Sequence, residues 1–387
     1  MKILLHMGQG KTGTTALQRS LHIASTKLRH QGVFYPRFGH KSSAHHLLLP
    51  LCGNPMRLPA WSLEDLGGPD GARQCAQAAW DETCLSVRQN RPDLLVLSSE
   101  FMTYRTDEHE KTFLFNLLSE LSDDITPVLY IRNPVDHYRS RLQQWLKQLN
   151  RPLPPTRLPL REAIVDDEAV FSNPLQLIAF DRTTLHGGDI VQDFSTRFLA
   201  PWVGATDLPS IQVNVGLSAE ALMLMVRLRA EGGNTDEVAR RVARLIPFLE
   251  GFDRDHPPAQ RLTLRPEVAE AALRVSTCHR WLAETGRLQI PGLDVDKIDG
   301  AAVPDWMMTA PPETLFPHDP DRLDHLRLAF EQASSDTTRG KTLLGPVVKR
   351  PRRISDLLLR FLRGQLASRD DRNTGAAPTR TQSDRRS

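Results

Sequence analysis

Short apolar runs of strand length recur along the chain, and helical patterns of apolar residues lie between them. The run at 94–97 is apolar at every position, which is typical of a strand buried on both faces of a parallel sheet. Helical spacing follows the first run, from Leu17 to Leu28, and recurs later. This alternation predicts an α/β fold of three layers, with a mainly parallel sheet flanked by helices and further helical additions. The expected strands are 2–6, 32–36, 94–97, 126–131 and 175–180, and the expected helices include 71–89, 134–150, 189–198 and 322–333.

The composition changes toward the end of the chain. Residues 1–335 carry the pattern of one α/β domain, in which about 213–300 are largely helical. Residues 336–387 combine a basic amphipathic stretch at 349–366 with a polar, charged tail that we expect to be disordered. Two interpretations of 349–366 stay open: it docks back onto the domain, or it lies on an anionic membrane surface.

The bulk composition narrows the class of protein. The 387 residues are 40% hydrophobic and 25% charged, which is ordinary for a globular chain. A net charge of +3 is too small to indicate nucleic acid as a partner. The four cysteines show no C-x-x-C spacing, so the sequence signals neither a zinc site nor a disulfide framework. The first apolar run is too short for a secretory signal and no run approaches a membrane span, so we expect a cytoplasmic protein.

The loop between the first strand and the first helix contains three glycines and Lys11. Glycines let backbone N–H groups approach an anion, the N-terminus of the following helix adds partial positive charge, and Lys11 adds a full one. The sequence therefore predicts a site for a phosphate-like group over this loop. The residues expected to bind it are Gly10, Lys11, Thr12, Gly13, Thr14 and Thr15.

A second candidate anion site follows the strand at 126–131. Asn133 fits the N-cap of the next helix and Pro134 its first residue. Arg132 is then at the strand end, and Ser140 is about two turns into the helix. A guanidinium and a hydroxyl on two rigid elements suit one phosphate group approached from two sides. A ligand that meets both sites carries two separate anionic groups.

An ATP-dependent phosphotransferase is one interpretation of the first site. The corresponding loop reads G-x-x-x-x-G-K-[ST], and counting back from Gly10 places Leu5 where the first glycine belongs. Such enzymes also hold Mg²⁺ with an acidic residue at the end of a second strand. The later strands here lead into Glu100 and Arg132, and neither supplies the expected aspartate. The motif is partial, and this alternative stays open.

The two motifs together resemble those of sulfotransferases that use 3′-phosphoadenosine 5′-phosphosulfate (PAPS). The pattern H-x-G-x-x-K-T-G-T-T-x-L-Q, from His6 to Gln18, is similar to the 5′-phosphosulfate loop of the bacterial and carbohydrate-directed branch of that family. Arg132, with Ser140 eight residues later, resembles the family's 3′-phosphate motif. The resemblance implies a P-loop-like fold, PAPS as co-substrate and transfer of its sulfuryl group without a metal.

The resemblance also implies roles for individual residues. Lys11 would stabilise the charge on the leaving phosphate, and Glu100 would take the proton of the acceptor. The alternative for Glu100 is that it only favours the N-terminus of the helix that follows it. His46, of the loop pair His45 and His46, is a second candidate for that base, or else a packing residue. The implied acceptor is a hydroxyl or amine of a glycan, a glycolipid or a small metabolite, and 349–366 would then contact the inner membrane surface. A relative that binds the nucleotide without catalysis is the remaining alternative.

Overall fold

The computed structural model describes residues 1–38, 45–147, 152–204, 208–211, 216–232, 238, 242 and 245–337. The basic stretch 349–366 and the rest of the predicted tail beyond 337 lie outside these described residues. None of the described helices combines the length and the apolar composition needed to cross a membrane.

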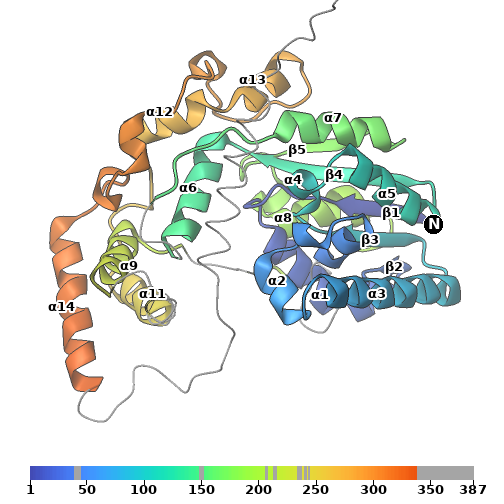
Figure 1. Ribbon diagram of the computed structural model, residues 1–387, viewed down its shortest axis with the longest axis horizontal. Helices are drawn as coiled ribbons and strands as arrows, with labels where there is room; N and C mark the ends of the chain where they lie inside the picture. Colours follow the sequence, from blue (N-terminus) through green and yellow to red (C-terminus); the bar gives the residue numbers. More distant parts are fainter. Residues whose placement is uncertain are drawn as a thin grey trace, which may run out of the picture. The chain divides into compact units, whose positions relative to one another are not determined.

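Five parallel strands form one sheet (Figure 1). They are β1 (Lys2–His6), β2 (Val33–Phe34), β3 (Leu94–Ser98), β4 (Ile125–Arg132) and β5 (Gln176–Phe180). Their order is β2-β3-β1-β4-β5, which places β1 in the centre. The register pairs His6 with Ser98 and Arg132 with Phe180, so the carboxyl ends of these strands meet at one edge of the sheet. The predicted α/β class and the parallel sheet are confirmed.

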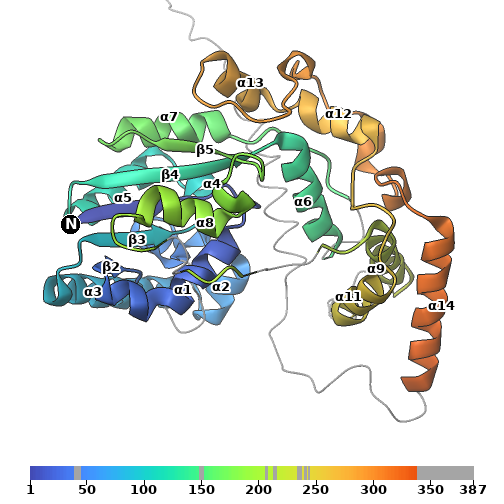
Figure 2. The same cartoon turned by 180° about the vertical axis from the view of Figure 1, so that it is seen from behind.

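Helices cover both faces of this sheet (Figures 1 and 2). They are α1 (Thr14–His30), α3 (Pro69–Asn90), α5 (Glu108–Ser119), α7 (Leu160–Val170), α8 (Ile190–Phe194) and α13 (Thr277–Glu284). Alternate residues of a strand point to opposite faces. Leu5 accordingly packs with residues of α3 and α5, whereas Leu4 packs with residues of α1 and α8. Leu129 of β4 packs with residues of α7 and α13. This arrangement is compatible with a fold of three layers.

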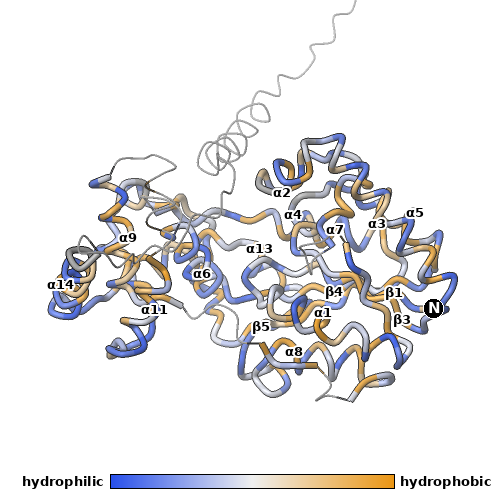
Figure 3. The backbone as a smooth tube through the Cα atoms, turned by 90° about the horizontal axis from the view of Figure 1, so that it is seen from below, coloured by the Kyte–Doolittle hydropathy of each residue, from blue (hydrophilic) through white to orange (hydrophobic). Residues whose placement is uncertain are grey.

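The central strands are apolar along nearly their whole length, and Figure 3 shows them as hydrophobic segments. All five residues of β3 are buried. A strand covered on both faces needs apolar side chains at odd and even positions alike, which explains the unbroken run in this part of the sequence.

One segment differs from its prediction. Residues 151–161 are rich in proline and arginine, a composition that predicts an exposed connection, but α7 begins at Leu160, and both Leu153 and Leu160 are buried. A buried ion pair helps to hold α7 on the neighbouring helix. Lys111 Nζ of α5 lies 2.7 Å from Asp167 Oδ1 of α7, and only 1% and 0% of these side chains are exposed.

The described part of the region 213–300 is largely helical. It contains α9 (Ala219–Gly232), α11 (Ile246–Asp255), α12 (Pro266–Arg274) and α13, and α14 (Pro320–Thr337) follows. These helices, except α13, share one hydrophobic cluster with α6 (Pro134–Leu146), which starts at the carboxyl edge of the sheet. Arg322 of α14 joins two of them, because its guanidinium lies 2.7 Å from Glu220 of α9 and 2.6 Å from Asp253 of α11. Shorter elements between β2 and α5 are the 3₁₀ turn η1 (His46–Leu51), α2 (Ala60–Asp65) and α4 (Met102–Arg105).

The end of α6 is fixed by a side chain from the helical region. The last carbonyl groups of a helix have no partner within it. Arg229 of α9 donates to Leu146 O at 2.7 Å and also to Lys147 O. The helix therefore ends at Leu146, earlier than the predicted end near 150.

Candidate functional site

The glycine-rich loop, residues 7–13, leaves β1 at the carboxyl edge of the sheet and runs beside β4. Met7 N–H donates to Val128 O at 2.9 Å, and Gln9 N–H donates to Tyr130 O at 3.2 Å. Ligands of open α/β sheets bind at this edge, where loops leave the strands. β4 thus holds the loop in the place where the sequence predicts an anion site.

The loop reaches α1 through left-handed backbone positions. Gly8, Lys11 and Gly13 have φ angles of 72°, 74° and 78°. Glycine adopts such angles at little cost, whereas a lysine does so only where the surrounding structure holds it. Gly13 precedes α1 without a side-chain cap. No side chain therefore caps the N-terminus of α1, where negative charge is favoured.

Glu100 lies directly against this loop. A Cβ atom added to Gly8 would be 3.0 Å from Glu100 Cβ, so the close approach requires a glycine. Glu100 Oε2 is 3.8 Å from the position that a Cβ of Gly10 would take. Burial lowers the pKa of Lys11, and attraction by the Glu100 carboxylate opposes that shift. The structure therefore brings Glu100 and Lys11 together over one loop.

Arg132, the last residue of β4, is bound to the same loop by two hydrogen bonds. Its backbone N–H donates to Gln9 Oε1 at 2.9 Å, and its Nη1 donates to Lys11 O at 3.0 Å. The guanidinium also lies over the ring of Phe180, with Cζ 5.4 Å from the ring centre. Burial lowers the pKa of Arg132, and the carboxylate of Asp136 opposes this effect. The two predicted anion sites are therefore parts of one hydrogen-bonded unit.

Helix α6 turns one polar face toward the loop. Asn133 caps it by accepting a hydrogen bond from Val135 N–H at 3.1 Å. His137 bonds to the backbone of Gly10, and Gln144 Oε1 accepts from Lys11 Nζ at 2.8 Å. Ser140 is three residues after His137 and four before Gln144, and residues at these spacings share a helix face. The half-buried Ser140 therefore lies on the face of α6 that meets the loop.

The surroundings of Lys11 are strongly cationic. Burial is the main cause of its lowered pKa, and Lys147, Arg132 and Arg141 lower it further by repulsion, against the attraction of Glu100. Lys11 thus has three cationic neighbours and one anionic neighbour, which favours an anionic ligand beside it. No family model, curated protein or solved structure matches this chain. What the site can bind follows from its own charges and geometry.

The threonines of the loop have different surroundings. Thr12 is buried, and its hydroxyl donates to Gln9 O at 2.5 Å, so it holds the loop together. Thr14 is also buried, and its Oγ1 has no hydrogen-bond partner among the described residues. Thr15 is exposed. The Thr12 hydroxyl is thus engaged within the loop, whereas the buried Thr14 hydroxyl lies beside Gly8.

The two histidines of the predicted loop pair lie outside this cluster. His45 is fully engaged with backbone: its Nε2 lies 2.9 Å from Pro36 O, and its Nδ1 accepts from Ser98 N–H at 2.7 Å. His46 is buried, with Nε2 3.2 Å from Ser62 Oγ and its ring edge-on to Phe101. Burial lowers the pKa of each ring to about 4. These contacts join His46 to the residue after Glu100 rather than to the loop.

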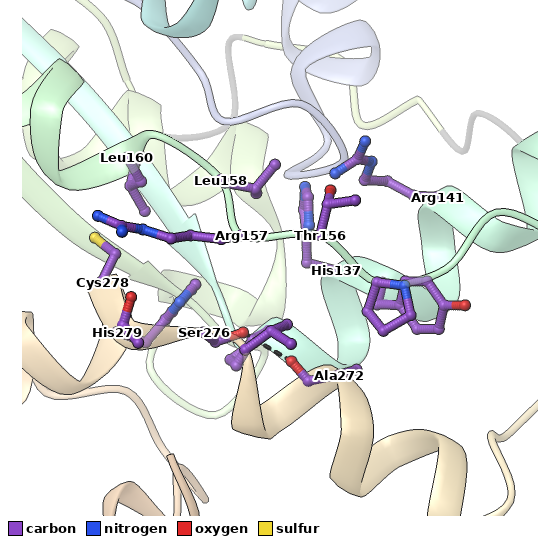
Figure 4. A pocket seen from close by; sticks show the side chains of 15 residues that line it. His137, Arg141, Thr156, Arg157, Leu158, Leu160, Ala272, Ser276, Cys278 and His279 are labelled. Carbon is purple, nitrogen blue, oxygen red and sulfur yellow. Dashed lines mark hydrogen bonds between the residues drawn. The ribbon is translucent and has the colours of Figure 1, made fainter. Parts of the chain in front are cut away.

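Sequence reasoning missed several residues of the site. Gln9 and Gln144 hold Arg132 and Lys11, and the rings of His137 and His279 line a cavity of about 30 Å³ between α6, α13 and the residues before α7 (Figure 4). The spacing from Ser140 could have indicated His137 and Gln144, because they lie on the same helix face. No comparable signal marks His279. The described residues contain no group of three histidine, cysteine or acidic side chains placed to hold a metal ion.

Proposed function

We propose that this protein is a PAPS-dependent sulfotransferase of P-loop-like fold that transfers a sulfuryl group to an acceptor hydroxyl or amine. The observation that carries the proposal is the hydrogen bond of 3.0 Å from Arg132 Nη1 to Lys11 O, between residues 121 positions apart. It joins two cationic anchors, Lys11 in the loop that follows β1 and Arg132 at the end of β4. A donor with a 3′-phosphate and a 5′-phosphosulfate needs two such anchors.

Each end of the donor has its own set of partners in this proposal. The backbone of residues 10–15, the hydroxyls of the loop threonines and the N-terminus of α1 receive the 5′-phosphosulfate. Arg132 and Ser140, on a strand end and on the facing side of α6, receive the 3′-phosphate. ATP has no 3′-phosphate and would leave the second anchor unused. Dependence on that phosphate therefore separates this function from ATP-driven phosphotransfer.

Lys11 and Glu100 carry the transfer step. The acceptor oxygen or nitrogen forms a bond to sulfur while the bond from sulfur to the 5′-phosphate oxygen breaks. Lys11 stabilises the negative charge that develops on that leaving oxygen, a contribution on the order of 3 kcal/mol by analogy with a single oxyanion donor. Glu100 takes the proton of the acceptor, because its carboxylate lies over the loop where the sulfuryl group would sit. His46, the second candidate from the sequence, is buried against Ser62 and Phe101 outside this cluster, so Glu100 is the base in this proposal.

The acceptor and the setting are proposed from chemistry alone. A hydroxyl or amine on a glycan, a glycolipid or a small metabolite suits a carboxylate base. We place the reaction in the cytoplasm, without nucleic acid and without a metal. Contact of 349–366 with the inner membrane surface would bring a lipid-linked acceptor within reach.

Calorimetric titration with 3′-phosphoadenosine 5′-phosphate (PAP), the product of the donor, tests the proposal against ATP with Mg²⁺. We expect tight binding of PAP without metal, weakened roughly 10- to 100-fold in Lys11→Ala and in Arg132→Ala, since each loses a charge-assisted hydrogen bond. Arg88→Ala is the matched control, because Arg88 lies in the last turn of α3, which leads to the opposite edge of the sheet.

The other outcomes separate the alternatives. Preference for ATP with Mg²⁺, or an affinity for PAP that is unchanged in Arg132→Ala, would reject the sulfotransferase assignment. A protein that binds PAP as expected but transfers no sulfuryl group to any acceptor class, with binding unchanged in Glu100→Gln, would be a nucleotide-binding relative without catalysis.

A further inference from the structure

Two buried histidines contact the backbone of the two proposed anchors from behind. His279, on α13, has its Nε2 3.1 Å from the carbonyl oxygen of Arg132. His137, on α6, bonds to the backbone of Gly10, the residue before Lys11. Only 4% of His279 and 6% of His137 is exposed. Figure 4 shows both rings lining the same cavity, one from each helix.

Each ring has one N–H to give, because each is neutral near pH 7. Burial lowers the pKa of His279 to about 4 and the pKa of His137 well below its ordinary value. A carbonyl oxygen only accepts hydrogen bonds, so the ring nitrogen that faces it must carry the proton. The N–H of His279 is therefore on Nε2 and points at Arg132 O. By the same argument, the ring N–H of His137 donates to the backbone carbonyl of Gly10.

Arg132 is held at three points by two parts of the chain, the glycine-rich loop and α13. Gln9 accepts from its backbone N–H at 2.9 Å, the carbonyl of Lys11 accepts from its Nη1 at 3.0 Å, and His279 donates to its carbonyl oxygen. This carbonyl lies where β4 ends and α6 begins, so the regular ladder of the sheet does not continue past it. A guanidinium binds a phosphate well only when its fork is held in the right direction.

We infer that His279 and His137 are positioning residues, the first for the 3′-phosphate anchor Arg132 and the second for the 5′-phosphosulfate loop. The inference rests on the proposed function and deepens it, since it assigns a role in donor selectivity to His279 of α13, which lies 147 residues after Arg132. Neither ring touches the donor in this assignment. Each acts through the backbone carbonyl that it holds.

The two histidines should leave different signatures on nucleotide binding. His279→Leu removes the hydrogen bond behind Arg132, so we expect PAP to bind roughly tenfold more weakly while adenosine 5′-phosphate, which lacks the 3′-phosphate, binds as before. His137→Leu disturbs the loop that both nucleotides use. In His137→Leu, PAP and adenosine 5′-phosphate should therefore both bind more weakly, by the same factor. A merely structural role would not separate the two nucleotides.

The experiment is calorimetric titration of the full chain with PAP and with adenosine 5′-phosphate, with folding checked by circular dichroism. His279→Gln tests rescue, because its side-chain amide offers an N–H to the same carbonyl. Cys278→Ser is the matched control, since Cys278 lines the same cavity and packs with α7 rather than with Arg132. If His279→Leu does not fold, His279→Ala takes its place.

Selective loss of PAP affinity in His279→Leu, with recovery in His279→Gln, supports the inference. Equal weakening of both nucleotides in His279→Leu, unchanged PAP binding, or failure of the glutamine variant to recover would overturn it while leaving the proposed function in place. A wild-type protein that binds PAP no better than adenosine 5′-phosphate would reject the proposed function, and the inference with it.

Discussion

Replacing Lys111 by methionine tests the buried ion pair between α5 and α7. Methionine keeps much of the apolar stem of the side chain and removes its charge. Lys111 Nζ lies 2.7 Å from Asp167 Oδ1 and donates to Ala163 O at 2.7 Å, in a place where both charged side chains are almost fully buried. The variant leaves the Asp167 carboxyl in the interior without a cation. Breaking a buried pair in this way costs about 3–5 kcal/mol of stability.

The size of this loss depends on pH in a defined direction. Burial raises the pKa of Asp167 from 3.8 to about 6 although Lys111 attracts its charge. Because folding raises this pKa, the contribution of Asp167 to the stability of the wild type falls as the pH rises from 3.8 to about 6. Above about pH 6 this contribution is constant. Without Lys111 the pKa is higher still, so the variant goes on losing stability above pH 6. Above pH 6, the difference in the free energy of unfolding between the wild type and Lys111→Met should therefore widen by about 1.4 kcal/mol per pH unit.

Urea unfolding followed by circular dichroism at pH 6, 7 and 8 measures that gap. Between pH 6 and 8 we expect it to grow by about 2.7 kcal/mol, provided that the carboxyl of the variant stays protonated. The double variant Lys111→Met/Asp167→Asn has no carboxyl at this place, so its own stability should not follow this pH dependence. The difference in unfolding free energy between it and Lys111→Met should therefore grow with pH in the same way. A difference between Lys111→Met and the wild type that is the same at pH 6 and pH 8 would refute the reasoning.

Two further substitutions test the loop and the helical region. Gly13→Ala should destabilise the protein by about 1–3 kcal/mol in thermal unfolding, because its φ is 78° and the new Cβ would lie 2.9 Å from Ile190 Cγ2. Gly10→Ala is the control and should cost less, because the nearest atom to its new Cβ is 3.8 Å away. Equal losses of stability in the two variants would contradict this prediction. Arg322→Leu should cost about 3–5 kcal/mol in urea unfolding, because it leaves the carboxylates of Glu220 and Asp253 without their cation. A midpoint close to that of the wild type would show that this ionic cluster holds nothing.

The strands and the two motif positions could be predicted from local sequence. The run that becomes β4 is apolar, and Asn133 and Pro134 mark a helix start directly after it. That order alone places Arg132 at a strand end. The glycines of the first loop likewise announce a turn, and Gly8 and Gly13 do adopt left-handed φ angles. In both cases the controlling interactions lie within a few residues of the pattern.

The residues that hold these motifs in place could not be predicted in the same way. Gln144 meets Lys11 from 133 positions away, and His279 meets Arg132 from 147 positions away. A single glutamine or histidine at such a distance makes no local pattern. The missed start of α7 has a related cause, because Lys111 and Asp167 look like surface charges until the two helices are packed together. Long-range pairing, rather than propensity, decides these contacts.

The central place of β1 has a consequence for the order in which the molecule can assemble during synthesis. β1 is made first among the strands, yet its two neighbours are β3, which pairs Leu94 with Lys2, and β4, which pairs Ile125 with Ile3. At about 5–20 residues per second, a ribosome needs roughly 5 to 20 seconds to reach the first of these partners. Until then, the apolar face of this strand and the glycine-rich loop behind it have nothing to pair with. The apolar β1 segment of the nascent chain therefore stays without its strand partners until β3 has been made, which makes it a segment that a chaperone could bind.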